Sequence, residues 1–87
     1  MNSMHIETLM NTSQAEYYVI RIPDSTVGDV YWMGNGYSTI KGFTAGEEVT
    51  IVRSRLQQAY SDAIRSQRDG GFNGTLEVIP RDQPWFI

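Results

Sequence analysis

The chain has 87 residues, of which 40% are hydrophobic and 20% charged, a composition that indicates one folded domain over residues 1–87 and excludes a disordered segment. Its net charge is −3, with acidic residues spread from Glu7 to Asp82, which disfavours both a nucleic-acid binder with a basic stripe and a DNA mimic with a dense acidic surface. The lack of cysteine excludes disulfides and thiolate nucleophiles, and the lack of an apolar run of about 18 residues excludes a membrane span.

The first predicted element of clear type is a strand over residues 16–22 (EYYVIRI), which is rich in β-branched and aromatic residues and is stopped by Pro23. The segment before it is weakly patterned: residues 5–10 fit either a short helical turn or a strand, and residues 11–14 fit a loop. Because side chains alternate along a strand, one face carries Tyr18, Ile20 and Ile22, and the other carries Tyr17, Val19 and Arg21.

Residues 23–28 form a turn-rich loop, and residues 29–33 (DVYWM) form a second strand. This strand is apolar on both faces, so its orientation stays open. Gly34-Asn35-Gly36 predicts a tight turn, because these residues tolerate positive φ. Residues 37–41 then form a short third strand, antiparallel to the second.

Residues 44–71 predict a long amphipathic helix over residues 45–68. Thr44 and Glu47 have the spacing of a capping box at its start, and Gly70 and Gly71 provide its stop. At about 100° per residue its apolar positions form one stripe, from which Ile51 alone lies roughly 140° away. The stripe consists of Ala45, Val49, Val52, Leu56, Ala59, Tyr60 and Ala63, with Ile64 at its border.

A helix over residues 45–68 is about 36 Å long, whereas an 87-residue globule is roughly 31 Å across and a six-residue strand covers only about 20 Å. A chain end must therefore cover Tyr60, Ala63 and Ile64. The candidates are Ile6, Leu9 and Met10 at one end, or Trp85, Phe86 and Ile87 at the other. A last strand over residues 75–79 (TLEVI) is ended by Pro80.

These elements predict an α+β fold of two layers. An antiparallel-dominated sheet of three to four strands carries one long helix across one face, in the order β-β-β-α-β. The opposite sheet face, with Tyr17, Val19 and Arg21, is too apolar to meet only water.

The sequence indicates no catalytic, cofactor or metal site, and we expect a non-enzymatic protein. His5 is the single histidine, and nothing in the sequence positions it as a base. Metal-binding clusters are lacking, since Glu47 and Glu48 are explained by the positive end of the helix dipole. Gly34-Asn35-Gly36 lacks the third glycine of a dinucleotide fingerprint.

The sequence instead favours protein binding, because aromatic and arginine residues dominate interface hot spots. The expected partner-binding residues lie on the open sheet face and in the C-terminal tail, and they are Tyr17, Val19, Arg21, Tyr31, Trp32, Met33, Trp85 and Phe86. The tail has the alternative of packing on Tyr60 and Ala63.

Three hypotheses follow. The first is an inhibitor or adaptor that acts by protein–protein contact. The second is a homodimeric structural or regulatory protein whose sheet face is the dimer interface. The third is a small-ligand or nucleotide binder that uses the turn at residues 34–37. The first ten residues lack the basic start and apolar run of a signal peptide, so we expect the protein to act in the cytoplasm.

The layout of several segments resembles that of small phage-encoded proteins of the anti-CRISPR inhibitor type. These segments are a short N-terminal lead, the strand EYYVIRI, the aromatic-glycine turn YWMGNGY, the helix entry GFTAGEEV and the closing strand TLEVIP. The resemblance implies a non-catalytic protein that binds and blocks a defence complex, here CRISPR-Cas, in the cytoplasm of a bacterial host. It implies no role for any individual residue.

Overall fold

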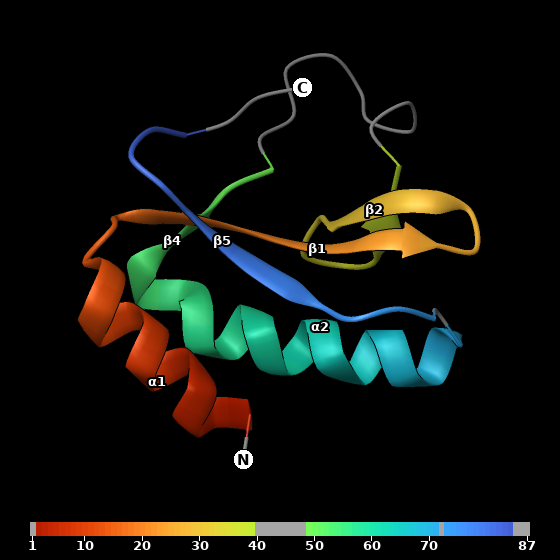
Figure 1. The fold of residues 1–87 in the computed structure, drawn as a ribbon, viewed down its shortest axis with the longest axis horizontal. Helices are drawn as coiled ribbons and strands as arrows, with labels where there is room; N and C mark the ends of the chain where they lie inside the picture. Colours follow the sequence, from red (N-terminus) through yellow and green to blue (C-terminus); the bar gives the residue numbers. More distant parts are fainter. Residues whose placement is uncertain (1, 40–48, 72, 85–87) are drawn as a thin grey trace.

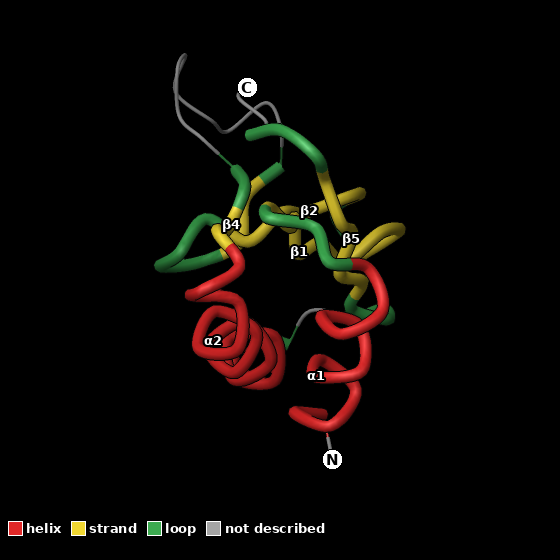
Figure 2. The backbone as a smooth tube through the Cα atoms, turned by 90° about the vertical axis from the view of Figure 1, so that its left-hand side faces the viewer, coloured by secondary structure: helices red, strands yellow, loops and turns green. Residues whose placement is uncertain are grey.

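A computed structural model of the chain describes residues 2–39, 49–71 and 73–84, and it has two helices on one side of a curled antiparallel sheet (Figures 1 and 2). The predicted α+β class is confirmed. The helices are α1 (Asn2–Ser13) and α2 (Leu56–Gly70), and the 3₁₀ turn η2 (Arg53–Arg55) leads into α2. The strands are β1 (Tyr17–Ser25), β2 (Gly28–Trp32), β3 (Tyr37–Ser38), β4 (Ile51–Val52) and β5 (Glu77–Arg81).

β1 is the centre of the sheet because it pairs with three other strands, all antiparallel. Tyr17 lies opposite both Val52 of β4 and Arg81 of β5, and Arg21 lies opposite both Tyr31 of β2 and Glu77 of β5. A strand has only two edges. β5 therefore runs along one edge of β1, while β4 and β2 occupy successive parts of the other edge.

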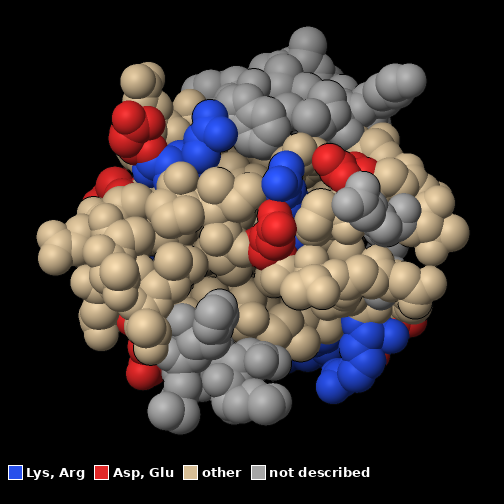
Figure 3. Space-filling model, viewed as in Figure 1, with Lys and Arg blue, Asp and Glu red and all other residues tan. Residues whose placement is uncertain are grey.

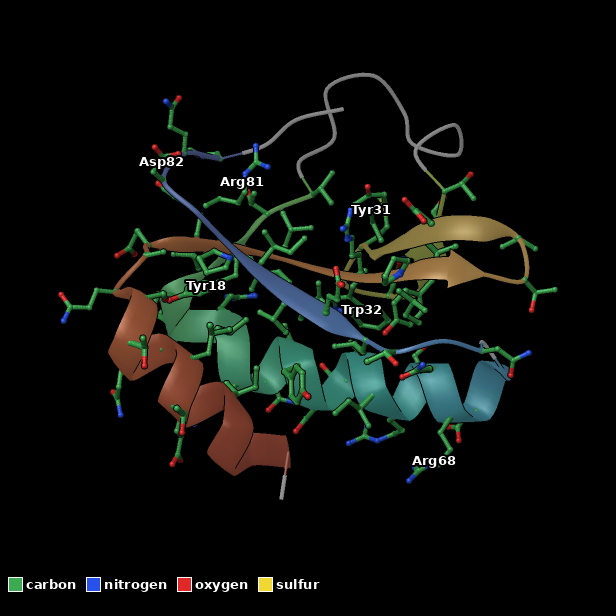
Figure 4. The ribbon with its side chains drawn as sticks, viewed as in Figure 1. Tyr18, Tyr31, Trp32, Arg68, Arg81 and Asp82 are labelled. Carbon is green, nitrogen blue, oxygen red and sulfur yellow. The ribbon has the colours of Figure 1, made fainter. Side chains whose placement is uncertain are left out.

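The predicted inner face of β1 is confirmed. Tyr18 and Ile20 are fully buried in a core cluster with Leu56, Tyr60 and Ala63 of α2. Trp32 belongs to the same cluster, and Tyr31 does not, so the two side chains point to opposite sides of β2 (Figure 4). This gives β2 the orientation that its sequence left open.

The outer face of the sheet is covered, which contradicts the expectation of an open apolar face. Val19 and Tyr31 are 1% and 6% exposed, and they form a second core cluster with Val49. Val49 belongs to the segment that was assigned to the helix stripe. The sequence prediction was wrong because it placed Val49 on the helix, against the inner face of the sheet, whereas Val49 packs on the outer face.

α2 begins at Leu56, 11 residues later than predicted, and ends as predicted with Gly71 in the left-handed conformation at φ 72°. Ile51 and Val52 form β4 instead, opposite Tyr18 and Tyr17. Their β-branched side chains favour a strand, and pairing with β1 satisfies their backbone groups. A helix of 15 residues is only about 22 Å long, so the length argument does not apply. The predicted capping box of Thr44 and Glu47 lies outside the described residues.

A chain end nevertheless packs on the helix, as expected. Residues 2–13 form α1, which includes the segment predicted as a loop, and Ile6 of α1 is fully buried against α2. Leu9 and Met10 pack on the same cluster. Gln14 ends the helix with φ 55°, and its backbone N–H donates to the carbonyl of Met10 over 3.3 Å. The tail residues Trp85 and Phe86 lie outside the described residues.

Pro23 and Pro80 were predicted to end two strands, but each proline lies within its strand. β1 continues beyond Pro23 to a two-residue turn at Thr26 and Val27, and β5 includes Pro80. Proline fits β5 because this strand lies along only one edge of β1 and has no second partner strand among the described residues. The turn at residues 34–36 and the short antiparallel strand after it are confirmed.

Candidate binding groove

The shared edge of β1 leaves a groove in the molecule where β2 ends and β4 begins. β2 is paired with β1 up to Tyr31, opposite Arg21, and β4 is paired with Tyr17 and Tyr18. Between these registers the two partner strands diverge. The cavity at this point, which we call the groove, has a volume of about 620 Å³, within the range of ligand-binding pockets.

The floor of the groove is apolar and its rim is polar. Trp32 of the inner core and Val49 of the outer core are buried at 4% and 2% exposure, and Ala59 of α2, which packs on the inner core, also lines the groove. Polar side chains of η2 and α2 form the rim. The complete lining among the described residues is Tyr17, Trp32, Met33, Gly34, Val49, Thr50, Ile51, Val52, Ser54, Arg55, Gln58, Ala59 and Asp62.

A second hollow of about 540 Å³ continues the groove along α2, and the two hollows share Trp32, Gly34 and Asp62. α2 and the last residue of η2 form one wall of both hollows, with positions spaced three or four residues apart, as one helix face requires. These positions are Arg55 of η2 and Gln58, Asp62, Arg65 and Asp69 of α2. Figure 2 shows α2 end-on with β4 above it.

The charged side chains along this wall differ in their partners. Asp62 accepts a hydrogen bond from the Gln58 side-chain amide over 3.0 Å and lies 3.8 Å from the guanidinium of Arg65. Arg55 is exposed, and within the described parts of the chain it forms no hydrogen bond or ion pair through its side chain. Among the described residues, the positive charge of Arg55 at this end of the groove therefore has no compensating partner.

The floor is held in place by an aromatic pair, the buried Trp32 and the partly buried Tyr37. Trp32 and Tyr37 contact edge to face, with ring centroids 5.2 Å apart and an angle of 63° between the rings. The Tyr37 hydroxyl donates a 2.8 Å hydrogen bond to the carbonyl of Ala63 in α2. Burial raises the pKa of Tyr37 above its ordinary value, so the hydroxyl stays protonated and can donate this bond. The pair links the β2–β3 turn to the helix wall.

On the other side of η2 lies a polar region, which we call the junction, formed by Arg53, the last turn of α1 and the start of β1. The Arg53 guanidinium donates to the carbonyl of Ala15 over 3.0 Å, to the hydroxyl of Tyr18 over 2.8 Å, and to the carbonyl of Met10. The Ser13 and Tyr18 hydroxyls are hydrogen-bonded over 2.8 Å. A cation at the carboxyl end of α1 also complements the helix dipole.

The predicted partner-binding residues fall into separate places. Tyr17, Trp32 and Met33 line the groove. Val19 and Tyr31 lie in the outer core, and Trp85 and Phe86 are outside the described residues. Arg21 forms an ion pair with Glu77 at 3.0 Å, and this hydrogen bond raises the pKa of Arg21.

Sequence reasoning missed the polar wall at Arg55, Gln58 and Asp62. Their regular spacing was visible in the sequence, but the prediction used only the apolar stripe of the helix and gave these residues no role. Only the position of β2 and its turn beside α2 shows that these residues border a groove.

The described residues show no arrangement typical of metal chemistry or membrane spanning. None of them form a group of three or more His, Asp or Glu side chains able to hold a metal ion. Over the same ranges, neither helix is long and apolar enough to cross a bilayer. The face shown in Figure 3 has basic and acidic side chains interspersed among uncharged ones, without a large patch of one sign.

Comparison of the chain with protein-family models, with curated proteins and with solved structures returns no match.

Proposed function

We propose that this protein is a non-enzymatic inhibitor or adaptor that binds another protein through the groove. The observation that carries the proposal is the groove itself: about 620 Å³, an apolar floor at Trp32 and Val49, and a rim of polar side chains on α2. A desolvated aromatic centre surrounded by polar groups is the usual composition of a protein-binding hot spot. Tyr17, Trp32 and Met33 keep the partner-binding role that the sequence suggested.

The finer identity of the partner follows from the sequence resemblance. If the layout of the chain reflects kinship with anti-CRISPR-type inhibitors, the partner is a bacterial defence complex and binding blocks its action. Inhibition by occlusion needs no catalytic group.

The test compares binding partners of the wild type and two matched variants. Gln58→Trp places a bulky ring at the rim of the groove, and Ser61→Trp places the same ring on the exposed side of α2 that does not line it. Each tagged protein is incubated with a bacterial lysate, and the captured proteins are quantified by mass spectrometry. We expect a set of proteins that the wild type and Ser61→Trp retain and Gln58→Trp loses.

Equal capture by all three proteins would remove the groove from the function. A control measurement of thermal unfolding shows whether both tryptophan variants are folded, since both positions are exposed and tolerate large side chains.

A small-molecule ligand is the second candidate, because Gly34 of the predicted turn lines the groove and the volume suits a drug-sized molecule. Thermal unfolding with a panel of nucleotides and small apolar acids tests it. A bound ligand at 100 times its Kd stabilises the folded state by about 2.7 kcal/mol. No shift with any member of the panel counts against this candidate.

The homodimer hypothesis loses its premise, because Val19 and Tyr31 are buried within one chain. Light scattering at micromolar concentration remains its direct test. Tyr17→Asp is the suitable variant because Tyr17 is partly exposed, whereas aspartate at Val19 would disrupt the core.

A further inference from the structure

We propose that the groove binds an extended segment of the partner protein. Apolar side chains of this segment enter the groove, and an acidic side chain next to them contacts Arg55. This inference rests on the proposed function and names the chemistry of the partner. It follows from three features: the length of the groove, its floor, and the unequal compensation of its charges.

The combined length of the groove and the second hollow favours a polypeptide over a compact ligand. The helix wall runs from Arg55 to Asp69, which corresponds to about 21 Å along the helix axis. An extended chain advances about 3.3 Å per residue, so the wall matches a segment of about six residues. A drug-sized molecule fills the first hollow and leaves the second, bounded by Arg65 and Gly70, without a ligand.

The floor selects apolar side chains. Trp32 and Val49 are almost fully buried, and the small part of each that is exposed borders the groove. Ala59 also lines the groove, and its small side chain leaves space there. Side chains that alternate along an extended segment can fill such a space with every second residue. Burial of their apolar surface supplies the main free energy of binding.

The charged side chains of the helix wall favour an acidic residue, not a basic one, beside the apolar residues of the bound segment. Asp62 is already compensated by Gln58 and Arg65, so a basic partner residue gains little there. Arg55 borders the first hollow and has no partner in the described structure. A carboxylate of the bound segment is the group that complements it, because guanidinium and carboxylate form paired hydrogen bonds.

The experiment uses a display library of random 12-residue peptides, panned on the immobilised full chain. Selected peptides are synthesised with a fluorescent label, and their affinities are measured by fluorescence polarisation. We expect sequences in which Asp or Glu lies next to apolar residues. We also expect peptides with Gln in place of that acid to bind about two- to fivefold more weakly, as for an exposed ion pair.

Variants of the protein assign the acidic contact to one residue. Arg55→Glu should weaken binding of the selected peptide by about tenfold and should restore binding of the peptide in which Lys replaces the acid, because opposite charges then meet again. Arg68→Glu is the matched control. Arg68 lies in α2, is exposed, lines neither hollow and points away from the sheet in Figure 4, although it lies 3.6 Å from Asp69 of the second hollow. Its variant should therefore keep the preference of the wild type for the acidic peptide.

Each outcome decides between the two proposals. Suppose that the selected peptides do not bind Gln58→Trp. If they then show no preference for an acidic residue, or bind Arg55→Glu as well as the wild type, this inference is overturned, and the groove remains the binding site. If lysate proteins depend on the groove but no peptide is selected, the groove binds a folded surface of its partner. This result also overturns the inference of an extended segment. If neither peptides nor lysate proteins depend on the groove, the proposed function itself fails.

Discussion

Arg53 and Arg55 are two residues apart in the same 3₁₀ turn, but they belong to regions of opposite character. At the junction, Arg53 donates to two backbone carbonyls and a tyrosine hydroxyl. At the groove, Arg55 is exposed and has no side-chain partner among the described residues. Arginine is thus a structural residue at position 53, where its guanidinium makes three hydrogen bonds, and a candidate recognition residue at position 55, where it makes none to the described residues.

The difference comes from what surrounds the two residues. The junction brings three backbone segments together, so unpaired carbonyls need a donor with several N–H groups. The groove lies where β2 and β4 diverge, and no backbone group of the described residues is hydrogen-bonded to the Arg55 side chain. Four predictions test this difference between the two residues.

The largest effect is expected for Arg53→Met at the junction. The substitution keeps most of the side-chain volume but removes the donors to Met10, Ala15 and Tyr18. We expect the free energy of unfolding to fall by about 3 kcal/mol, because three hydrogen bonds to a charged group are lost and the Ala15 carbonyl loses its Arg53 donor, whereas Met10 keeps Gln14 and Tyr18 keeps Ser13 as partners. Urea denaturation measures this change. Arg55→Met is the control, with an expected change within about 0.5 kcal/mol, and equal losses in both variants would contradict the comparison.

The second prediction uses alkaline pH to test the support of the groove floor. Burial raises the pKa of Tyr37 and of Tyr60 in the folded state, so above the unfolded value near 10 the folded state holds more protons than the unfolded state. Stability should therefore be complete below pH 10 and fall as pH rises beyond it, by up to about 1.4 kcal/mol per pH unit for each tyrosine. Urea denaturation at pH 8 and pH 11 measures the fall. Tyr37→Phe should reduce it, and an unchanged fall in that variant would show that Tyr37 is not responsible.

The third prediction concerns the buried tyrosine of the junction. Tyr18→Phe removes the hydroxyl that accepts from Arg53 and is bonded to Ser13, without changing the apolar contacts of the ring. We expect a loss of about 1 kcal/mol, measured by thermal unfolding. In the Arg53→Met background the same change should cost less, because the two residues form one network. Additive losses would show that the Arg53–Tyr18 bond contributes little.

The smallest expected effect is a gain. Arg55 is the N-cap residue of α2, where a positive charge opposes the helix dipole. Arg55→Glu should raise the free energy of unfolding by about 0.3–1 kcal/mol at low salt, and less at high salt. Urea denaturation at two salt concentrations measures the gain. A loss of stability would indicate that Arg55 has a structural partner.

The sheet was the most predictable part of the fold. Residues 16–22 formed a strand with the expected faces, and the turn at residues 34–36 led into an antiparallel strand. These features depend on local alternation and turn chemistry, which a sequence states directly. The start of α2 was wrong because Val49 and Val52 also fit a helical stripe. Ile51, which did not fit it, was the signal that a strand replaced the helix there.

The remaining errors concern contacts between distant segments. α1 has a weak pattern, and its carboxyl end is held by Arg53, 43 residues away from Met10. The groove exists only because β2 and β4 share one edge of β1, and no local pattern encodes that arrangement. Tyr17, Trp32 and Met33, which the sequence proposed for an open sheet face, line the groove instead, and their partner-binding role stays a prediction.

The use of one strand by three partners has a consequence for the order in which the molecule assembles. Contacts of β1 with β2 join residues only 10 apart, such as Arg21 and Tyr31, whereas Tyr17 lies 35 residues from Val52 and 64 from Arg81. Closing the shorter loop loses less chain entropy. We therefore expect the β1–β2 hairpin to form first as a template, and the polypeptide to complete its sheet by adding β4 and β5 to the two sides of a strand already in place.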